Sequence, residues 1–120
     1  VDLATDRPEV YRLRDDLLAF NLAWIDRWLE LPYQGLHFAD DWGSQTNLLI
    51  SPDKWRQFFK PVYQAMFSRV KTAGLDVWFH SDGHLNEIMG DLIEIGVDVF
   101  QLLQPSSVLG IKEFGRKFAG

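Results

Sequence analysis

Two short segments of the chain combine residue types that could do chemistry. Residues 36–43 read Leu-His-Phe-Ala-Asp-Asp-Trp-Gly, and residues 77–83 read Val-Trp-Phe-His-Ser-Asp-Gly. A buried strand of a parallel sheet has this pattern when its C-terminal end opens into a polar pocket. Because parallel strands of one sheet end on the same side, we expect both polar clusters to face one pocket.

Asp40 and Asp41 are the carboxylates of the first cluster. Adjacent side chains of a strand point to opposite faces, so only one of the two can face the pocket. That carboxylate could act as a general base, as a metal ligand or as an acceptor for a cationic or N–H-bearing ligand. Alternatively, both belong to a turn in which Asp bonds local amides and Gly43 supplies a positive φ. Trp42 is a candidate substrate contact.

His80 and Asp82 of the second cluster alternate along the chain, so both could point the same way and form an imidazole–carboxylate pair. With Asp40 or Asp41 nearby, these donors would suit a metal ion. Alternatively, Asp82 caps the next helix and His80 is a core histidine bonded to backbone. Ser81, between them, is a candidate substrate contact.

Gln101 and Gln104 follow the third apolar run, where a closed barrel places its ligand contacts. Ordinary amide hydrogen bonding in the loop before Pro105 is the alternative. Of the other histidines, His84 is expected to be exposed, and His37 to face the helix layer or a neighbouring strand.

Helices are predicted between these runs. The first begins with Asp6 as capping carboxylate and Pro8 in its first turn, and ends before Pro32. Its apolar residues recur every three or four positions, which predicts one face that packs in the core: Val10, Leu13, Leu17, Phe20, Trp24 and Trp28.

A second helix begins at residues 51–53 and ends at Gly74, and we expect Pro61 to kink it or to split off its first turns. A third spans residues 85–95 and ends at Gly96. A fourth covers residues 108–119. The predicted strands are residues 35–40, 76–80 and 97–102.

This alternation is typical of parallel strands joined by right-handed crossovers. We therefore predict an α/β fold with about three parallel strands and flanking helices. A full (β/α)₈ TIM barrel needs about 250 residues, so residues 1–120 are interpreted as a partial barrel, and the initial Val1 is taken as a sign of a longer protein. Three strands leave two open edges, from which we expect self-association or completion by the rest of the barrel.

Composition excludes several classes of function. The chain has 120 residues, a net charge of −5 and no long run of Lys or Arg, which argues against nucleic acid as a partner. It has no cysteine, hence no disulfide, thiolate zinc site or cysteine nucleophile. Neither a membrane span nor a signal peptide is visible, and we expect a cytoplasmic protein.

Taken together, these segments resemble the uroporphyrinogen decarboxylase superfamily, which also contains methylcobamide-dependent methyltransferases. The family strand end Phe-Asp-Ser-Trp-Ala-Gly is similar to residues 39–43, its Ser-Pro helix start to residues 51–58, and its Pro-Tyr helix to residues 60–63. Later family motifs are similar to residues 79–83 and 96–99. The resemblance spans residues 35–104 and depends on the order and spacing of these motifs.

Several positions depart from the family pattern. Asp41 stands where decarboxylases have a substrate-contacting serine, and residues 103–104 replace their Asp-Trp. The zinc methyltransferases carry His-x-Cys; His80 matches the histidine, but Asp82 stands at the cysteine position. The decarboxylases' chief catalytic aspartate and the methyltransferases' last zinc cysteine belong to strands that these residues do not include.

The resemblance implies two enzymatic functions. The first is decarboxylation of tetrapyrrole acetate side chains without a cofactor, using substrate positioning and an aspartate that binds pyrrole N–H groups. The second is methyl transfer from a corrinoid, with zinc on His80 and Asp82 activating the acceptor. A non-catalytic barrel fragment is the third alternative. The catalytic candidates are Asp40, Asp41, His80 and Asp82, and the candidate substrate contacts are Trp42, Ser81, Gln101 and Gln104.

Overall fold

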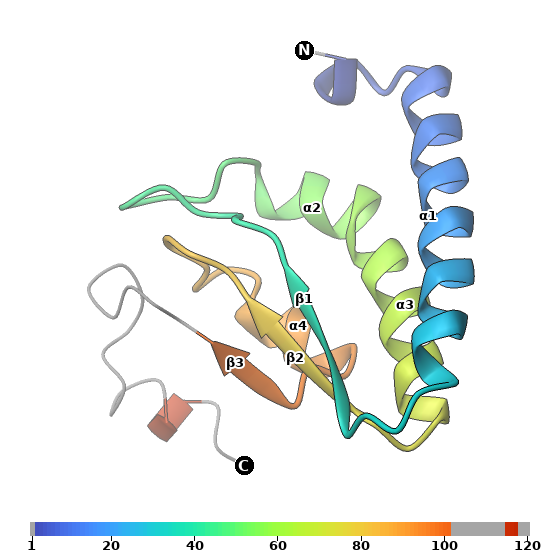
Figure 1. Ribbon diagram of the computed structural model, residues 1–120. Coiled ribbons are helices and arrows are strands. Elements are labelled where there is room, and N and C mark those ends of the chain that lie inside the picture. The colour runs from blue at the N-terminus through green and yellow to red at the C-terminus, as the bar shows by residue number, and fades with distance from the viewer. Residues whose placement is uncertain (1, 102–114, 118–120) are drawn as a thin grey trace.

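Three parallel strands form an open sheet in the order β1-β2-β3, with helices packed against it (Figure 1). The computed structural model describes residues 2–101 and 115–117. After a 3₁₀ turn at Asp2–Thr5, the elements are α1 (Pro8–Leu29), β1 (Gly35–Ala39), α2 (Pro52–Phe58), α3 (Lys60–Thr72), β2 (Asp76–His80), α4 (Met89–Glu94) and β3 (Val99–Gln101). The predicted α/β class, with three parallel strands and flanking helices, is confirmed, and the described strands do not close into a barrel.

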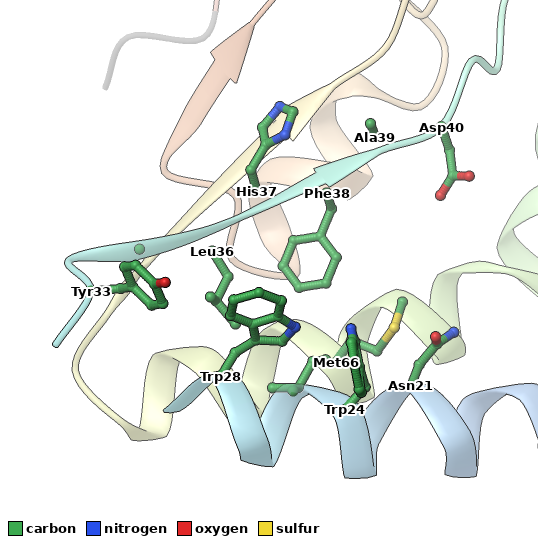
Figure 2. A pocket seen from close by; sticks show the side chains of 12 residues that line it. Asn21, Trp24, Trp28, Tyr33, Leu36, His37, Phe38, Ala39, Asp40 and Met66 are labelled. Atoms are coloured by element: carbon green, nitrogen blue, oxygen red, sulfur yellow. The ribbon is translucent and has the colours of Figure 1, made fainter. Parts of the chain in front are cut away.

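The two faces of the sheet have different environments. Alternate residues of the strands, such as Phe38 and Phe79, pack against the helices, and Phe79 is fully buried. His37 and Trp78 point to the other face, where Trp78 is 45% exposed. Figure 2 shows Phe38 directed toward the helices and His37 directed away from them. His37 was expected to face the helix layer or a neighbouring strand. It does not face the helices, but its ring lies 6.3 Å from that of His80 in the neighbouring strand β2.

The core lies between this sheet and α3, α4 and one face of α1. Trp55 and Phe67 from α2 and α3 are its largest fully buried side chains besides Phe79. The remaining buried apolar residues come from all layers: Ile25, Phe58, Tyr63, Met66, Val70, Val77, Leu85, Ile88, Met89, Leu92, Ile95 and Val97.

Helix α1 differs from its prediction at its start. Its N-cap is Arg7, which makes no side-chain cap, and Asp6 has a positive φ of 51°. The carboxylate of Asp6 lies one residue too early to cap the helix; it accepts hydrogen bonds from the Tyr11 hydroxyl and the Lys54 ammonium. The expected cap is therefore wrong.

The apolar face predicted to be buried in α1 is also wrong. Leu13, Phe20 and Trp24 are between 56% and 66% exposed, whereas Ile25 is buried and Leu18 packs against the core. The helix carries two apolar faces, and the second packs against α3. Helical periodicity reports that a face is apolar, not which of two faces has a partner.

The signals at α2 and α3 are confirmed. The Ser51 hydroxyl accepts a hydrogen bond from the Lys54 backbone N–H at 3.3 Å and caps α2. Pro61 stands at the start of α3, so the predicted helix is split at Phe59. The segment ends at Gly74, whose φ is +76°.

Other boundaries are shorter than predicted. Helix α4 begins at Met89 rather than residue 85, because the preceding stretch is a loop in which the His84 N–H donates to the Ser44 carbonyl and Arg56 donates to the Glu87 carbonyl. Strand β3 begins at Val99 rather than residue 97. Residues 108–114 and 118–119 of the last predicted helix, and Gln104, lie outside the described residues.

Among the described residues, no helix combines the length and apolar character needed to cross a bilayer.

Candidate metal centre

Asp41, His80 and Asp82 come together where β1 and β2 end. One ligand atom from each lies within 4.8 Å of the other two. The His80 Nε2 atom is 3.8 Å from Asp41 Oδ1 and 4.0 Å from Asp82 Oδ1. The parallel register, in which Ala39 pairs with His80, puts the first residues after both strands at one edge. The expectation that the two polar segments meet is confirmed for these three residues.

The third strand orients the His80 ring. Its Nδ1 atom lies 2.9 Å from the backbone carbonyl of Gln101, which pairs with His80 in the register of β2 and β3. In the tautomer that donates this hydrogen bond, Nε2 carries a free lone pair directed at the two carboxylates. Histidine ligands of metals are usually fixed in this way through their second nitrogen.

The two carboxylates are held differently. Asp41 accepts a hydrogen bond from the Asp82 backbone N–H at 2.9 Å, yet its side chain remains 63% exposed. The Asp82 side chain is 33% exposed, but its Oδ1 atom is buried and has no hydrogen-bond partner among the described residues. A buried carboxylate oxygen without a donor is costly unless a cation faces it.

Close contact between two glycines brings the loops after β1 and β2 together. Gly83 has a φ of +81°, and a Cβ atom there would overlap the backbone of Gly43. A Cβ atom on Gly43 would likewise overlap the backbone of His84. The adjacent hydrogen bond from the His84 N–H to the Ser44 carbonyl, 2.8 Å long, closes the contact. Asp41 and Asp82 can therefore meet because both loops lack a side chain here.

Asp40 points away from this cluster. Its Oδ2 atom accepts a 2.5 Å hydrogen bond from the Tyr63 hydroxyl, whose oxygen accepts another from Trp42 Nε1 at 3.0 Å. Burial, together with the neighbouring Asp40 carboxylate, raises the pKa of Tyr63. Asp40 lines a cavity of about 540 Å³ between α1 and β1 (Figure 2). As expected for adjacent strand residues, only one of the two aspartates joins the candidate site.

The candidate substrate contacts have other surroundings. Ser81 is 1% exposed; its hydroxyl accepts from the Trp42 N–H and donates to the Asp82 carbonyl. The Trp42 ring packs against Phe59 at a centroid distance of 4.5 Å. Both side chains support the loops from within the packed layer. Gln101 is exposed, and its backbone carbonyl bonds the His80 ring.

His37 lies near the candidate site, although it was not among the predicted site residues. Its ring centroid is 6.3 Å from that of His80, on the open face of the sheet. The alternation of residues 37, 39 and 41 would have shown that His37 and Asp41 point to one side. His84, expected to be exposed, is partly buried and lies 3.1 Å from Glu87.

One imidazole nitrogen and two carboxylates form a donor set that suits zinc and other divalent first-row metals. Ligand atoms that bind one zinc ion at about 2.1 Å in a tetrahedron lie about 3.4 Å apart. The His80–aspartate separations of 3.8 and 4.0 Å are slightly longer, so small side-chain movements would bring these atoms into the zinc geometry. The buried Oδ1 of Asp82, which accepts no hydrogen bond from any described residue, is a further reason to expect a cation. The donor types of these three residues therefore suit a divalent metal ion that draws their side chains closer together.

Comparisons with protein-family models, with curated proteins and with solved structures found no match to this chain. The resemblance to the uroporphyrinogen decarboxylase superfamily thus remains a prediction.

Proposed function

We propose that the chain forms part of a TIM-barrel enzyme of the uroporphyrinogen decarboxylase superfamily whose active site contains a divalent metal ion, in the manner of the corrinoid-dependent methyltransferases. The observation that carries this proposal is the convergence of His80 Nε2 with Asp41 and Asp82, all within 4.8 Å at the C-terminal edge of the sheet. Active sites of (β/α)₈ barrels lie at this edge. Parallel strands with helices packed on one face are compatible with such a barrel.

His80, Asp41 and Asp82 would hold the ion, which would supply a Lewis acid for activating a methyl acceptor. The carbonyl of Gln101 fixes the His80 ring, and the Asp82 N–H fixes the Asp41 carboxylate. These bonds hold the donors in position before any ligand arrives, which lowers the cost of binding. Because Asp82 replaces a cysteine of the resembled zinc sites, harder ions than zinc should also bind.

Decarboxylation of a tetrapyrrole remains a second candidate, favoured by one observation. The carboxylate of Asp41 is mostly exposed at the same edge and can accept N–H groups of a substrate. This reaction uses no metal, so it would persist when chelator is added to a full-length enzyme. The methyl transfer would be lost and would return with zinc or cobalt.

Calorimetric titration of the purified chain with Zn²⁺ tests the metal centre. We expect one ion per chain, and an affinity that falls at least about tenfold in His80→Ala and in Asp82→Asn. Loss of a residue that merely supports a metal ligand usually lowers metal affinity by about tenfold or more, and loss of a ligand itself should cost at least as much. Asp40→Asn is the matched control: it changes the neighbouring carboxylate, which bonds Tyr63 instead. We expect wild-type affinity from it.

Absence of Zn²⁺ binding, or equal affinity in His80→Ala and wild type, would contradict the metal-dependent proposal. The decarboxylase and the non-catalytic fragment would then be the remaining candidates. Circular dichroism of each variant establishes that the fold is retained.

A further inference from the structure

Helix α1 carries an exposed apolar stripe, defined by Leu13, Leu17, Phe20, Trp24 and Trp28. These side chains are between 38% and 66% exposed. They contact one another: the Phe20 and Trp24 rings stack at 6.4 Å, and the Trp24 and Trp28 rings meet edge to face at 6.0 Å. The stripe is separate from the face of α1 that contacts α3. The stripe therefore remains exposed in the fold of the described residues.

The stripe forms one wall of a groove. A cavity of about 540 Å³ lies between Trp24, Trp28 and strand β1, as Figure 2 shows. A second, of about 340 Å³, continues along Leu13 and Leu17. Both are lined by Asn21, so they adjoin along the helix. Walls this exposed cannot enclose a small ligand, which usually has most of its surface buried. A macromolecular surface fits better.

The exposed area is of the size that a dimer buries. Leu31 and Tyr33 extend the apolar surface beyond α1 at 45% and 46% exposure. At roughly 200 Å² per fully exposed large side chain, the seven residues present on the order of 700 Å². A monomer seldom exposes more than about 600 Å² in one patch, whereas a stable interface buries about 800 Å² per partner.

The spacing makes the stripe complementary to itself in an antiparallel pair. A two-fold axis near Phe20 places Leu13 opposite Trp28 of a second copy and Leu17 opposite its Trp24, because each pair of numbers has the same sum. Each leucine thus lies opposite a tryptophan along the contact between the two helices. Three- and four-residue spacing is the pattern with which helices pair.

Charges at the edge of the stripe agree with this register. Asp16 and Arg27 lie on the same flank of α1, because they are eleven positions apart, or about three turns. In an antiparallel pair the same flanks meet, and Arg27 of the second copy lies level with residue 14, within one turn of Asp16. Opposite charges therefore face each other twice across the axis.

We propose that the stripe is a homodimer interface, in which α1 packs antiparallel against α1 of a second copy of this chain. The proposal does not depend on the metal centre.

Sedimentation of the purified chain at increasing concentration tests it. We expect a dimer whose dissociation constant rises at least about tenfold in Trp24→Glu, because a charge would be buried at the seam. Leu49→Glu is the control, since Leu49 is 67% exposed outside the stripe; it should dimerise as the wild type does. Asp16→Arg and Arg27→Asp should each weaken the dimer, and the double variant should restore it.

Because the chain has no cysteine, single cysteines report the register. Phe20→Cys should form a disulfide-linked dimer under mild oxidation, and the exposed control Ile93→Cys should not. A chain that remains monomeric, or a dimer that Trp24→Glu leaves intact, would overturn the proposal. Either result would assign the stripe to a different partner, such as further strands of a barrel.

Discussion

At the scale of single residues, two adjacent aspartates have separate roles. Asp41 joins His80 and Asp82 at the edge of the sheet, whereas Asp40 accepts the hydroxyl hydrogen of Tyr63 on the helical side. Strand alternation made this division predictable. The partner of Asp40 was not predictable, because Tyr63 lies 23 residues further along the chain and its orientation depends on how α3 packs.

Replacement of Tyr63 tests this separation. Tyr63→Phe removes the hydroxyl that bonds both the Asp40 carboxylate and the indole Nε1–H of Trp42. We therefore expect the free energy of unfolding at neutral pH to fall by about 1–3 kcal/mol. Zn²⁺ affinity should not change. Urea unfolding and calorimetry measure the two effects. Tyr33→Phe, which changes an exposed tyrosine, is the control.

The same variant should alter the alkaline stability of the chain. The pKa of Tyr63 is raised in the folded state by burial and by Asp40, so at alkaline pH the unfolded chain loses this proton first. The contribution of protonated Tyr63 to the free energy of unfolding is complete below about pH 10, the ordinary tyrosine pKa. It falls as the pH rises above that value. Tyr63→Phe should therefore show a shallower loss of stability above pH 10. An unchanged slope would count against the buried tyrosine–carboxylate pair.

At the scale of elements, the glycine contact between the two site loops is the feature most open to test. Gly83→Ala places a Cβ atom against Gly43 at a positive φ, so it should separate the loops and lower Zn²⁺ affinity at least about tenfold. Gly74→Ala is the matched control: its φ is also positive, but nothing lies within 4 Å of the added atom. It should cost about 1–2 kcal/mol of stability and leave metal binding unchanged.

If both substitutions lower stability equally and neither changes Zn²⁺ affinity, the glycine contact does not position the site.

Signals that act within a few residues predicted the elements well. The Ser51 cap, the Pro61 break and strand β2 all lie where the sequence indicated. Features that depend on distant partners were missed: Asp6 bonds Lys54 instead of capping α1, and residues 84–88 form a loop held by Ser44 and Arg56. The meeting of His80 with the aspartates was predictable from parallel topology. That no described residue donates a hydrogen bond to the buried Oδ1 of Asp82 was not predictable.

At the scale of the whole molecule, the sheet is uncovered in two ways. One face exposes His37 and Trp78, and among the described residues β1 pairs with β2 alone. The Asp40 N–H donates to the His80 carbonyl, so the alternating amides of residues 37 and 39 point to the open edge. These features leave room for further strands, as a partial barrel requires.

Hydrogen exchange tests this arrangement. We expect rapid exchange at the amides of His37 and Ala39 and much slower exchange in β2, which is paired on both sides. Strong protection at residues 37 and 39 would instead mean that another strand covers the edge.

The central claim is that His80 binds a metal ion through Nε2 while Nδ1 bonds the Gln101 carbonyl. Nitrogen-15 NMR of the imidazole rings with and without Zn²⁺ tests it directly, because the chain has three histidines to assign. We predict a large Zn²⁺-induced shift at His80 Nε2, a retained Nδ1–H, and smaller changes at His37 and His84. A shift at another histidine, or none at His80, would contradict the proposed metal centre.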